Sequence, residues 1–215
     1  MLISHLDHIT IVAPSLAVGV EYVRQTLGVT PQPGGEHPRM GTHNALLRLG
    51  EEMFLEVIAV NPDSPDPGRP RWFELDQLRP DAAPHLGTWV ARTTDIQAVV
   101  AASPVSLGSI EPMSRGALNW LITIPEDGSL PLHGIAPTLI QWQNGPHPAS
   151  KLPDQGCTLV KLEGFHPQAD ALSHMLQSAG FQGSFVVYPM GAGQRPYLVA
   201  HIQTPDGVRV LRSTG

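Results

Sequence analysis

The sequence lacks the features that mark three large classes of protein. Its 215 residues include a single cysteine, which excludes an internal disulfide and a thiolate-rich zinc site. No apolar run approaches the roughly 20 residues that a membrane-spanning helix needs. Lys and Arg number 13 against 19 Asp and Glu, and they form no basic cluster of the kind that binds nucleic acid. We therefore expect neither a membrane nor a nucleic-acid partner.

Several short functional motifs are also missing. There is no glycine-rich phosphate loop, no CxxC pair and no nucleophile elbow, which removes the simplest signs of nucleotide binding, dithiol chemistry and acyl transfer. The first residues lack the basic and apolar regions of a secretory signal, so we expect a cytoplasmic protein. With 41% hydrophobic and 15% charged residues, the composition is that of a soluble globular protein.

The order of predicted elements repeats three times along the chain. Each pass indicates a strand, a helix and further strands, with Ser15 and Asp95 as helix N-caps and Gly28 and Gly180 as helix stops. The predicted first pass has strands at 5–13, 43–49 and 53–60 and a helix between Ser15 and Gly28. The second has strands at 86–91, 109–113, 118–124 and 137–142 and a helix at 95–102. The third has strands at 158–163, 184–188, 197–203 and 208–211 and a helix at 167–179.

Two polar residues in the first pass interrupt otherwise apolar strands. His8 lies within Leu6–Val12 and Glu56 within Met53–Ile58. A buried carboxylate costs several kcal/mol unless it is paired or bound to a cation, and imidazole and carboxylate are common ligands of divalent metals. If the two strands are adjacent, these residues form half of a metal site. A metal-free polar pocket and a purely structural ion pair are the alternatives.

Several segments together resemble the glyoxalase-like branch of the vicinal oxygen chelate superfamily. The segments are Asp7-His8-Ile9, Gly41-Thr42-His43-Asn44, Phe54-Leu55-Glu56-Val57-Ile58, Leu139-Ile140-Gln141-Trp142 and Pro146-His147-Pro148. The resemblance implies an α+β fold in which repeated β-α-β-β-β modules form curved mixed sheets around a cleft. It implies a glyoxalase-like domain over 1–150, built from paired modules at 1–61 and 85–145, and a third module at 157–215.

The resemblance also implies a divalent metal ion, such as Zn, Ni, Mn or Fe, held by the first and last strands of each module. His8 and Glu56 match the two positions in the first module. In the second module Thr88 stands where a histidine is expected, and Gln141 lies opposite Glu56. A full set of four ligands is not visible. Either His43 substitutes as the third ligand, or the site is degenerate.

Four further residues are candidates for binding or catalysis. His43 is either an acid–base group facing the cleft or part of a turn. Arg115 has the fork of donors that suits a carboxylate, and Trp120 is suited to wall an apolar pocket; a surface arginine and a core tryptophan are the alternatives. Strand alternation allows only one of Gln141 and Trp142 to face the cleft, and the match to Glu56 favours Gln141.

The resemblance leaves two functions open, because one fold hosts many chemistries. The first is a metal-dependent enzyme of lyase, isomerase or dioxygenase type that acts on a small oxygen-rich molecule. The second is a non-catalytic protein that sequesters a small molecule. The third module has no visible partner, so we expect it either to form a homodimer with its counterpart or to close against the first two modules, since an open sheet exposes an apolar face and an edge.

Overall fold

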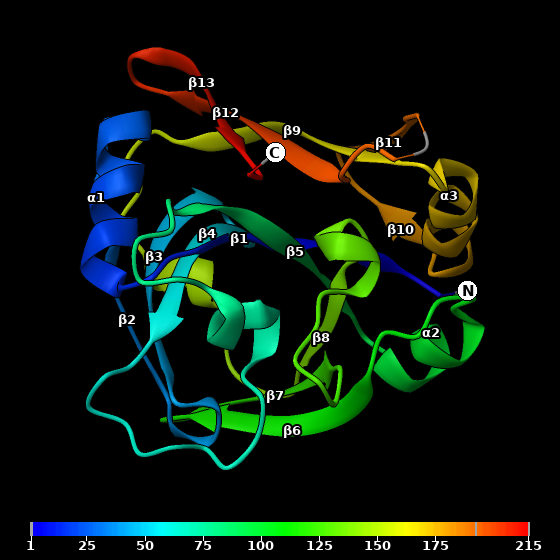
Figure 1. Ribbon diagram of the computed structural model, residues 1–215, viewed down its shortest axis with the longest axis horizontal. Coiled ribbons are helices and arrows are strands. Elements are labelled where there is room, and N and C mark those ends of the chain that lie inside the picture. The colour runs from blue at the N-terminus through cyan, green and yellow to red at the C-terminus, as the bar shows by residue number, and fades with distance from the viewer. Residues whose placement is uncertain (1, 192, 215) are drawn as a thin grey trace.

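A computed structural model describes residues 2–191 and 193–214. Figure 1 shows a strongly curved sheet whose outer side carries helices, with a second, smaller sheet lying across it. The mixture of helices and curved mixed sheets confirms the predicted α+β class with β-α-β-β-β modules. None of the helices within the described residues is long and apolar enough to cross a membrane.

The first module follows the predicted order and adds one strand that the sequence reading missed. Its elements are β1 (Ser4–Val12), α1 (Leu16–Leu27), β2 (Gln32–His37), β3 (Thr42–Gly50) and β4 (Met53–Val60). The Ser15 side chain accepts a hydrogen bond from the Val18 backbone N–H, and Gly28 ends the helix with a φ of 76°, as expected for these caps. The strand β2 contains a proline and two glycines, which are tolerated because it lies at the edge of the sheet.

The second module repeats this arrangement. Its elements are β5 (His85–Thr93), α2 (Ile96–Ala102), β6 (Ser109–Arg115), β7 (Leu118–Ile124) and β8 (Thr138–Trp142). In each module the last strand runs parallel to the first, β4 beside β1 and β8 beside β5. The antiparallel pairing of β1 with β5 joins the modules into one sheet with the order β2-β3-β4-β1-β5-β8-β7-β6.

The pairing of β1 with β5 contains a bulge at Asp7. Leu6 pairs with Ala91 and His8 pairs with Val90, so Asp7 is an extra residue in β1. A bulge of this kind changes the direction of a side chain relative to regular alternation. Leu6 and Ile9 pack in the core on the convex face of the sheet, whereas Asp7 and His8 both contact side chains on the concave face.

Side chains connect the two edges of the curved sheet. Arg39, just after β2, donates to the Pro112 carbonyl of β6 at 2.8 Å and forms an ion pair with Glu111. Arg69 pairs with the same carboxylate at 2.6 and 2.7 Å. The edges β2 and β6 are thus brought together by side chains, and the sheet encloses most of a barrel.

The third module has the predicted elements and one additional short strand, β10, but its strand neighbours differ from those of the first two modules. Its elements are β9 (Thr158–His166), α3 (Ala169–Ser178), β10 (Phe181–Gln182), β11 (Phe185–Pro189), β12 (Tyr197–Thr204) and β13 (Gly207–Arg212). The sheet order is β11-β9-β12-β13, and β10 pairs with β1 of the first module. The first strand, β9, therefore lies between β11 and β12 of its own module, whereas β1 and β5 each lie at one side of their own modules.

The third module closes against the first two, which is the second of the expected arrangements. Leu162, Leu198 and Ile202 belong to the same buried cluster as Trp89 of β5. The Trp89 ring lies 4.5 Å from that of Phe185, and its indole N–H donates to the Ile135 carbonyl at 2.9 Å. The apolar face of this module is buried within the chain, so the reason for expecting a homodimer through it no longer applies.

Candidate functional site

A small polar cleft lies on the concave face of the sheet. The space between its side chains, including the part that is open to solvent, is about 390 Å³. Its lining combines charged, imidazole and aromatic side chains from both modules and from the connection between β4 and β5. The lining residues are His8, His37, Asn44, Phe54, Glu56, Trp72, Phe73, Arg115, Trp120, Ile122, Ile140 and Trp142.

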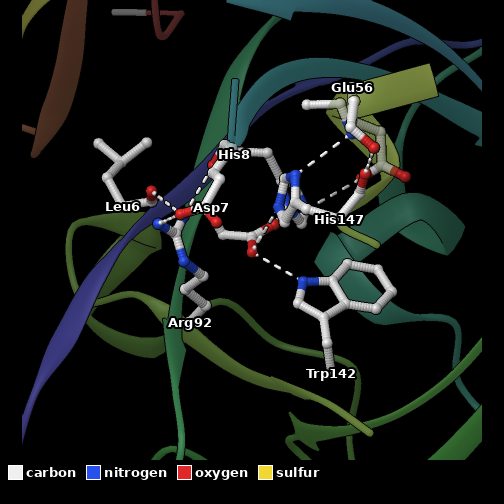
Figure 2. A network of polar contacts seen from close by, with 10 residues as sticks. Leu6, Asp7, His8, Glu56, Arg92, Trp142 and His147 are labelled. Atoms are coloured by element: carbon white, nitrogen blue, oxygen red, sulfur yellow. Dashed lines mark hydrogen bonds and ion pairs between the residues drawn. The ribbon is translucent and has the colours of Figure 1, made fainter. Parts of the chain in front are cut away.

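Asp7 lies fully buried behind His8 and accepts hydrogen bonds from three side chains (Figure 2). Its Oδ1 lies 2.6 Å from His8 Nδ1, and its Oδ2 lies 2.8 Å from Trp142 Nε1 and 3.1 Å from His147 Nε2. Burial by itself would raise the pKa of Asp7, but the hydrogen bonds from His147 and His8 outweigh it and hold the pKa well below its usual range. The carboxylate is therefore ionised and acts only as an acceptor.

The hydrogen bonds around Asp7 determine which nitrogen of each histidine carries a proton. The backbone N–H of Ala149 donates to His147 Nδ1 at 3.2 Å, so His147 carries its proton on Nε2 and donates it to Asp7. His8 must likewise donate from Nδ1, since an ionised carboxylate has no proton to give. A neutral His8 therefore presents an unprotonated Nε2 to the cleft, with its ring stacked on Phe54 at 4.4 Å.

Nε2 of His8 faces a carboxylate oxygen of Glu56. The two atoms are 3.7 Å apart, which is beyond hydrogen-bond distance. The other oxygen of Glu56 accepts a hydrogen bond from Asn44 Nδ2 at 2.6 Å. Asn44 is held in this orientation because its Oδ1 accepts from the Gly35 backbone at 2.9 Å and from Arg115 at 3.2 Å. When His8 is neutral, two acceptor atoms converge here, and a proton or another cation between them would relieve their repulsion.

His37 and Arg115 form the opposite side of the cleft. His37 Nδ1 lies 3.1 Å from the Thr42 hydroxyl, and its Nε2 lies 3.4 Å from Arg115 Nη1. Burial lowers the pKa of His37 to about 3, and the charge of Arg115 acts in the same direction. Burial also lowers the pKa of Arg115, although the nearby Glu56 opposes this effect. At neutral pH His37 is therefore uncharged and can accept a hydrogen bond from the guanidinium.

The structure brings together His8, Glu56, Arg115 and Trp120, but not His43. Leu46 pairs with Glu56, and His43 pairs with Ala59, so alternation directs His43 to the opposite face of the sheet from Glu56. Asn44 occupies the place in the cleft that the sequence reading gave to its neighbour. The expectation that His43 is a ligand or an acid–base group in this cleft is therefore wrong, because its side chain lies on the other face of the sheet.

The last strand of the second module also faces the reverse of the expected way. Gln141 points away from the cleft, and its Oε1 accepts a hydrogen bond from the Ile96 backbone N–H at the start of α2 at 2.9 Å. Trp142 lines the cleft and donates to Asp7. Gln141 is thus a cap of α2 rather than a residue of the cleft. The choice between these neighbours depended on an alignment that was one residue out of phase.

The sequence did not predict three residues of the hydrogen-bond network around His8 and Glu56, namely Asp7, Asn44 and His147. Asp7 carried a signal, because it is a charged residue inside an apolar strand, but regular alternation placed it on the face opposite His8. His147 carried a weaker signal as the histidine of Pro146-His147-Pro148. Its loop begins just after β8, which brings its ring within 5.9 Å of the Trp142 ring.

A family model described as a glyoxalase-like domain matches residues 6–180. The chain belongs to the glyoxalase-like domain family. This confirms the resemblance to the glyoxalase-like branch of the vicinal oxygen chelate superfamily. No curated protein matches the chain.

Solved structures resemble this chain at low sequence identity. A hypothetical protein from Staphylococcus aureus aligns with 99% of this chain and 86% of its own, with a TM-score of 0.59 and 15% identity. Methylmalonyl-CoA epimerase from Mycobacterium tuberculosis aligns with 66% of this chain and 88% of its own, at a TM-score of 0.43 and 19% identity. A variant of methylmalonyl-CoA epimerase from Streptomyces coelicolor, in complex with 2-nitronate-propionyl-CoA, aligns with 66% of this chain and 98% of its own. Its TM-score is 0.45 and its sequence identity is 21%.

The donor atoms in this glyoxalase-like cleft do not complete a metal site. His8 Nε2 and Glu56 Oε2 are suitable ligands, and Asp7 is placed as the outer partner that such a histidine usually has. The second module contributes Ile140 and Trp142, which cannot ligate a metal. Within residues 2–191 and 193–214, no group of three or more His, Cys, Asp or Glu side chains is placed to hold an ion, whereas a catalytic zinc site has three protein ligands.

Proposed function

We propose that this protein is an enzyme of lyase or isomerase type that acts on a small oxygen-rich molecule, with His8 and Glu56 as its acid–base pair. The observation that supports this most strongly is that His8 Nε2 and Glu56 Oε2 lie 3.7 Å apart. A hydrogen bond to Asp7 orients His8, and a hydrogen bond from Asn44 orients Glu56. Two such groups can share or exchange one proton with a molecule placed between them. A purely structural pair would not need an opening to the cleft.

In this proposal His8 Nε2 removes a proton from a carbon next to a carbonyl or carboxyl group. The C–H electron pair enters the substrate as an enolate, and the imidazolium is stabilised by Asp7 behind it and Glu56 in front. The proton then returns to another atom of the substrate, giving isomerisation, or the electron pair expels a leaving group, giving elimination. Asp7 is a positioning residue, because it fixes the His8 ring and its tautomer without touching the substrate.

Arg115 and Trp120 support the proposal as substrate-binding residues, since both line the cleft beside Glu56. The metal-dependent version of the enzyme, with Zn, Ni, Mn or Fe at His8 and Glu56, needs a third ligand that the described residues do not supply. The sequestering function is the second candidate. The aromatic walls favour it, because Phe54, Trp72 and Trp120 can enclose an apolar molecule without chemistry.

The test is hydrogen–deuterium exchange of substrate C–H groups in D₂O, followed by NMR for a panel of 2-oxo acids, 2-hydroxy acids and 1,2-dicarbonyl compounds. We expect at least one class to exchange, and we expect His8→Gln and Glu56→Gln each to slow exchange by about 10²-fold or more. The matched control is His85→Gln, since His85 lies outside this cleft.

Metal content measured on the same samples separates the alternatives. Near-stoichiometric metal in the wild type that disappears in His8→Gln and Glu56→Gln would overturn the metal-free assignment and support the metal-dependent enzyme. Tight binding of a panel compound with no exchange in any sample would favour sequestration instead.

A further inference from the structure

We infer that Arg115 and Trp72 form a subsite for a carboxylate group, so that the molecule bound in this cleft is a small carboxylic acid. The inference deepens the proposed function by naming the substrate class, but it concerns binding and is tested without any reaction. It rests on two donors that line the same cleft: a guanidinium that has neutral acceptors but no carboxylate partner, and an indole N–H that has no acceptor among the described residues.

The first donor is the guanidinium of Arg115, at the end of β6. Its Nη1 contacts Asn44 Oδ1 and His37 Nε2, and within the described residues its Nε and Nη2 donate no hydrogen bond and no carboxylate lies within ion-pair distance. Arg39 and Arg69, which lie nearby, both pair with Glu111. Arg115 is half-buried, and an arginine in such a place usually has a carboxylate partner. Its planar fork matches the two oxygens of a carboxylate.

The second donor is the indole N–H of Trp72. This residue is 4% exposed, and its Nε1 has no hydrogen-bond partner among the described residues. The buried indoles of Trp89 and Trp142 each have an acceptor, namely the Ile135 carbonyl and the Asp7 carboxylate. A buried N–H without an acceptor is destabilising. Trp72 lines the cleft with Arg115, and its ring lies 5.2 Å from that of His37.

A single group that satisfies both donors must accept hydrogen bonds and carry negative charge. A carboxylate does so with one charge, whereas a phosphate would bring about two charges close to Glu56 at neutral pH and be repelled. His37 does not compete, because it is neutral and its Nε2 faces the guanidinium.

The position of the subsite also limits where the rest of the molecule lies. Asn44 bridges Arg115 and Glu56, accepting from the first through Oδ1 and donating to the second through Nδ2. A carboxylate on Arg115 is therefore one amide side chain away from the acid–base pair. The carbon next to that carboxylate is the part of the molecule nearest His8 and Glu56, as in a 2-hydroxy or 2-oxo acid.

The experiment is a titration followed through the indole N–H signals of ¹⁵N-labelled protein. The chain has four tryptophans, and Trp72→Phe assigns the signal of interest. We expect lactate to shift the Trp72 signal while leaving that of Trp89 in place, and we expect lactamide, which has the same shape but no charge, to have no effect. Arg115→Gln should abolish the shift, Arg115→Lys should weaken binding at least tenfold, and Arg39→Gln should leave it unchanged.

Three results would overturn the subsite: no shift with lactate, pyruvate or glycolate at tens of millimolar; an equal shift with lactamide or chloride; or a shift that persists in Arg115→Gln. Arg115→Lys keeps the test valid if Arg115→Gln fails to fold. The proposed function can fail separately. Lactate binding that survives in His8→Gln, together with an absence of proton exchange in the wild type, would leave the carboxylate subsite in place and remove the acid–base role.

Discussion

Asp7 accepts hydrogen bonds from side chains of three segments, namely β1, β8 and the loop that follows β8. An asparagine has the same shape but one acceptor and one donor, so Asp7→Asn leaves at least one of the three N–H groups facing an N–H. We expect the free energy of unfolding to fall by about 3 kcal/mol or more, as when one partner is removed from a buried pair. Denaturant unfolding measures this, with the exposed Asp66→Asn as control.

The same substitution tests whether Asp7 fixes the tautomer of His8. Histidine ¹⁵N spectra should show the His8 proton on Nδ1 in the wild type and a mixture of tautomers in Asp7→Asn. An unchanged Nδ1–H form in the variant would show that Asp7 only supports the fold.

His37 should make the protein less stable in mild acid. Its pKa in the folded state is lowered from 6.5 to about 3, so below pH 6.5 the unfolded chain binds a proton that the folded protein does not. The contribution of neutral His37 to the free energy of unfolding is fully present above pH 6.5, and it is lost as the pH falls from 6.5 towards 3. At about 1.4 kcal/mol per pH unit, we expect a loss of about 2 kcal/mol between pH 7.5 and 5.

The variant His37→Gln isolates this contribution, since glutamine does not titrate. Unfolding free energies at pH 7.5 and 5 should differ less in the variant than in the wild type, by about the same 2 kcal/mol. Asp7 does not interfere, because its lowered pKa affects stability only below its usual range near pH 4. Equal pH dependence in both proteins would show that His37 accepts a proton in the folded state.

At the scale of the residue, the sequence indicates the two residues that the proposed function uses, His8 and Glu56, and misplaces their neighbours. His8 and Glu56 stand out because each is polar within an apolar strand. The choices of His43 over Asn44 and of Gln141 over Trp142 both depended on strand phase, and a shift of one residue reverses every side chain. No local pattern shows which face of β3 meets Glu56, because that depends on the pairing of Leu46 with Glu56.

The helix α1 packs on β4 through Gly19. A Cβ at this position would overlap the side chains of Val57 and Ala13. Gly19→Ala gains about 1 kcal/mol of helix propensity, but we expect a net loss of about 1–3 kcal/mol because the overlap forces the helix away from the sheet. Urea unfolding measures the change.

Val18 provides the control for this helix, because it is 46% exposed. Val18→Ala should change the free energy of unfolding by no more than about 0.5 kcal/mol. If Gly19→Ala stabilises the protein as much as propensity predicts, the close approach of α1 to β4 is not a feature of the folded state.

Elements with local signals were predicted well, and elements defined by pairing were not. Ser15, Gly28 and Asp95 give the ends of α1 and the start of α2 through hydrogen bonds within a few residues. The strand β2 was read as a loop because its proline and glycines are unusual in strands. The strand order of the third module depends on contacts between distant segments, which an order of elements along the chain does not determine.

At the scale of the whole molecule, the third module completes the core of the first two. Phe185 is 7% exposed and packs on Trp89, so Phe185→Ala leaves a cavity between the two sheets. We expect the free energy of unfolding to fall by about 3–5 kcal/mol. Fluorescence and circular dichroism should still report one coincident transition, because the modules share one core.

The exposed Val186 on the same strand is the control, and Val186→Ala should change stability by about 0.5 kcal/mol or less. Two separate transitions in the wild type, with only one affected by Phe185→Ala, would show that the third module folds independently.

The extra residue in β1 has a consequence for the descent of this site. Asp7 can reach His8 only because the strand is one residue longer than its partner between Leu6 and His8. In a regularly paired strand, substitution alone cannot create this arrangement, because a carboxylate introduced beside a histidine points to the other face. The Asp–His pair therefore requires the bulge. Among related chains, those that have the contact between these two side chains should also have the irregular pairing, and those with regular pairing at this position should lack the contact.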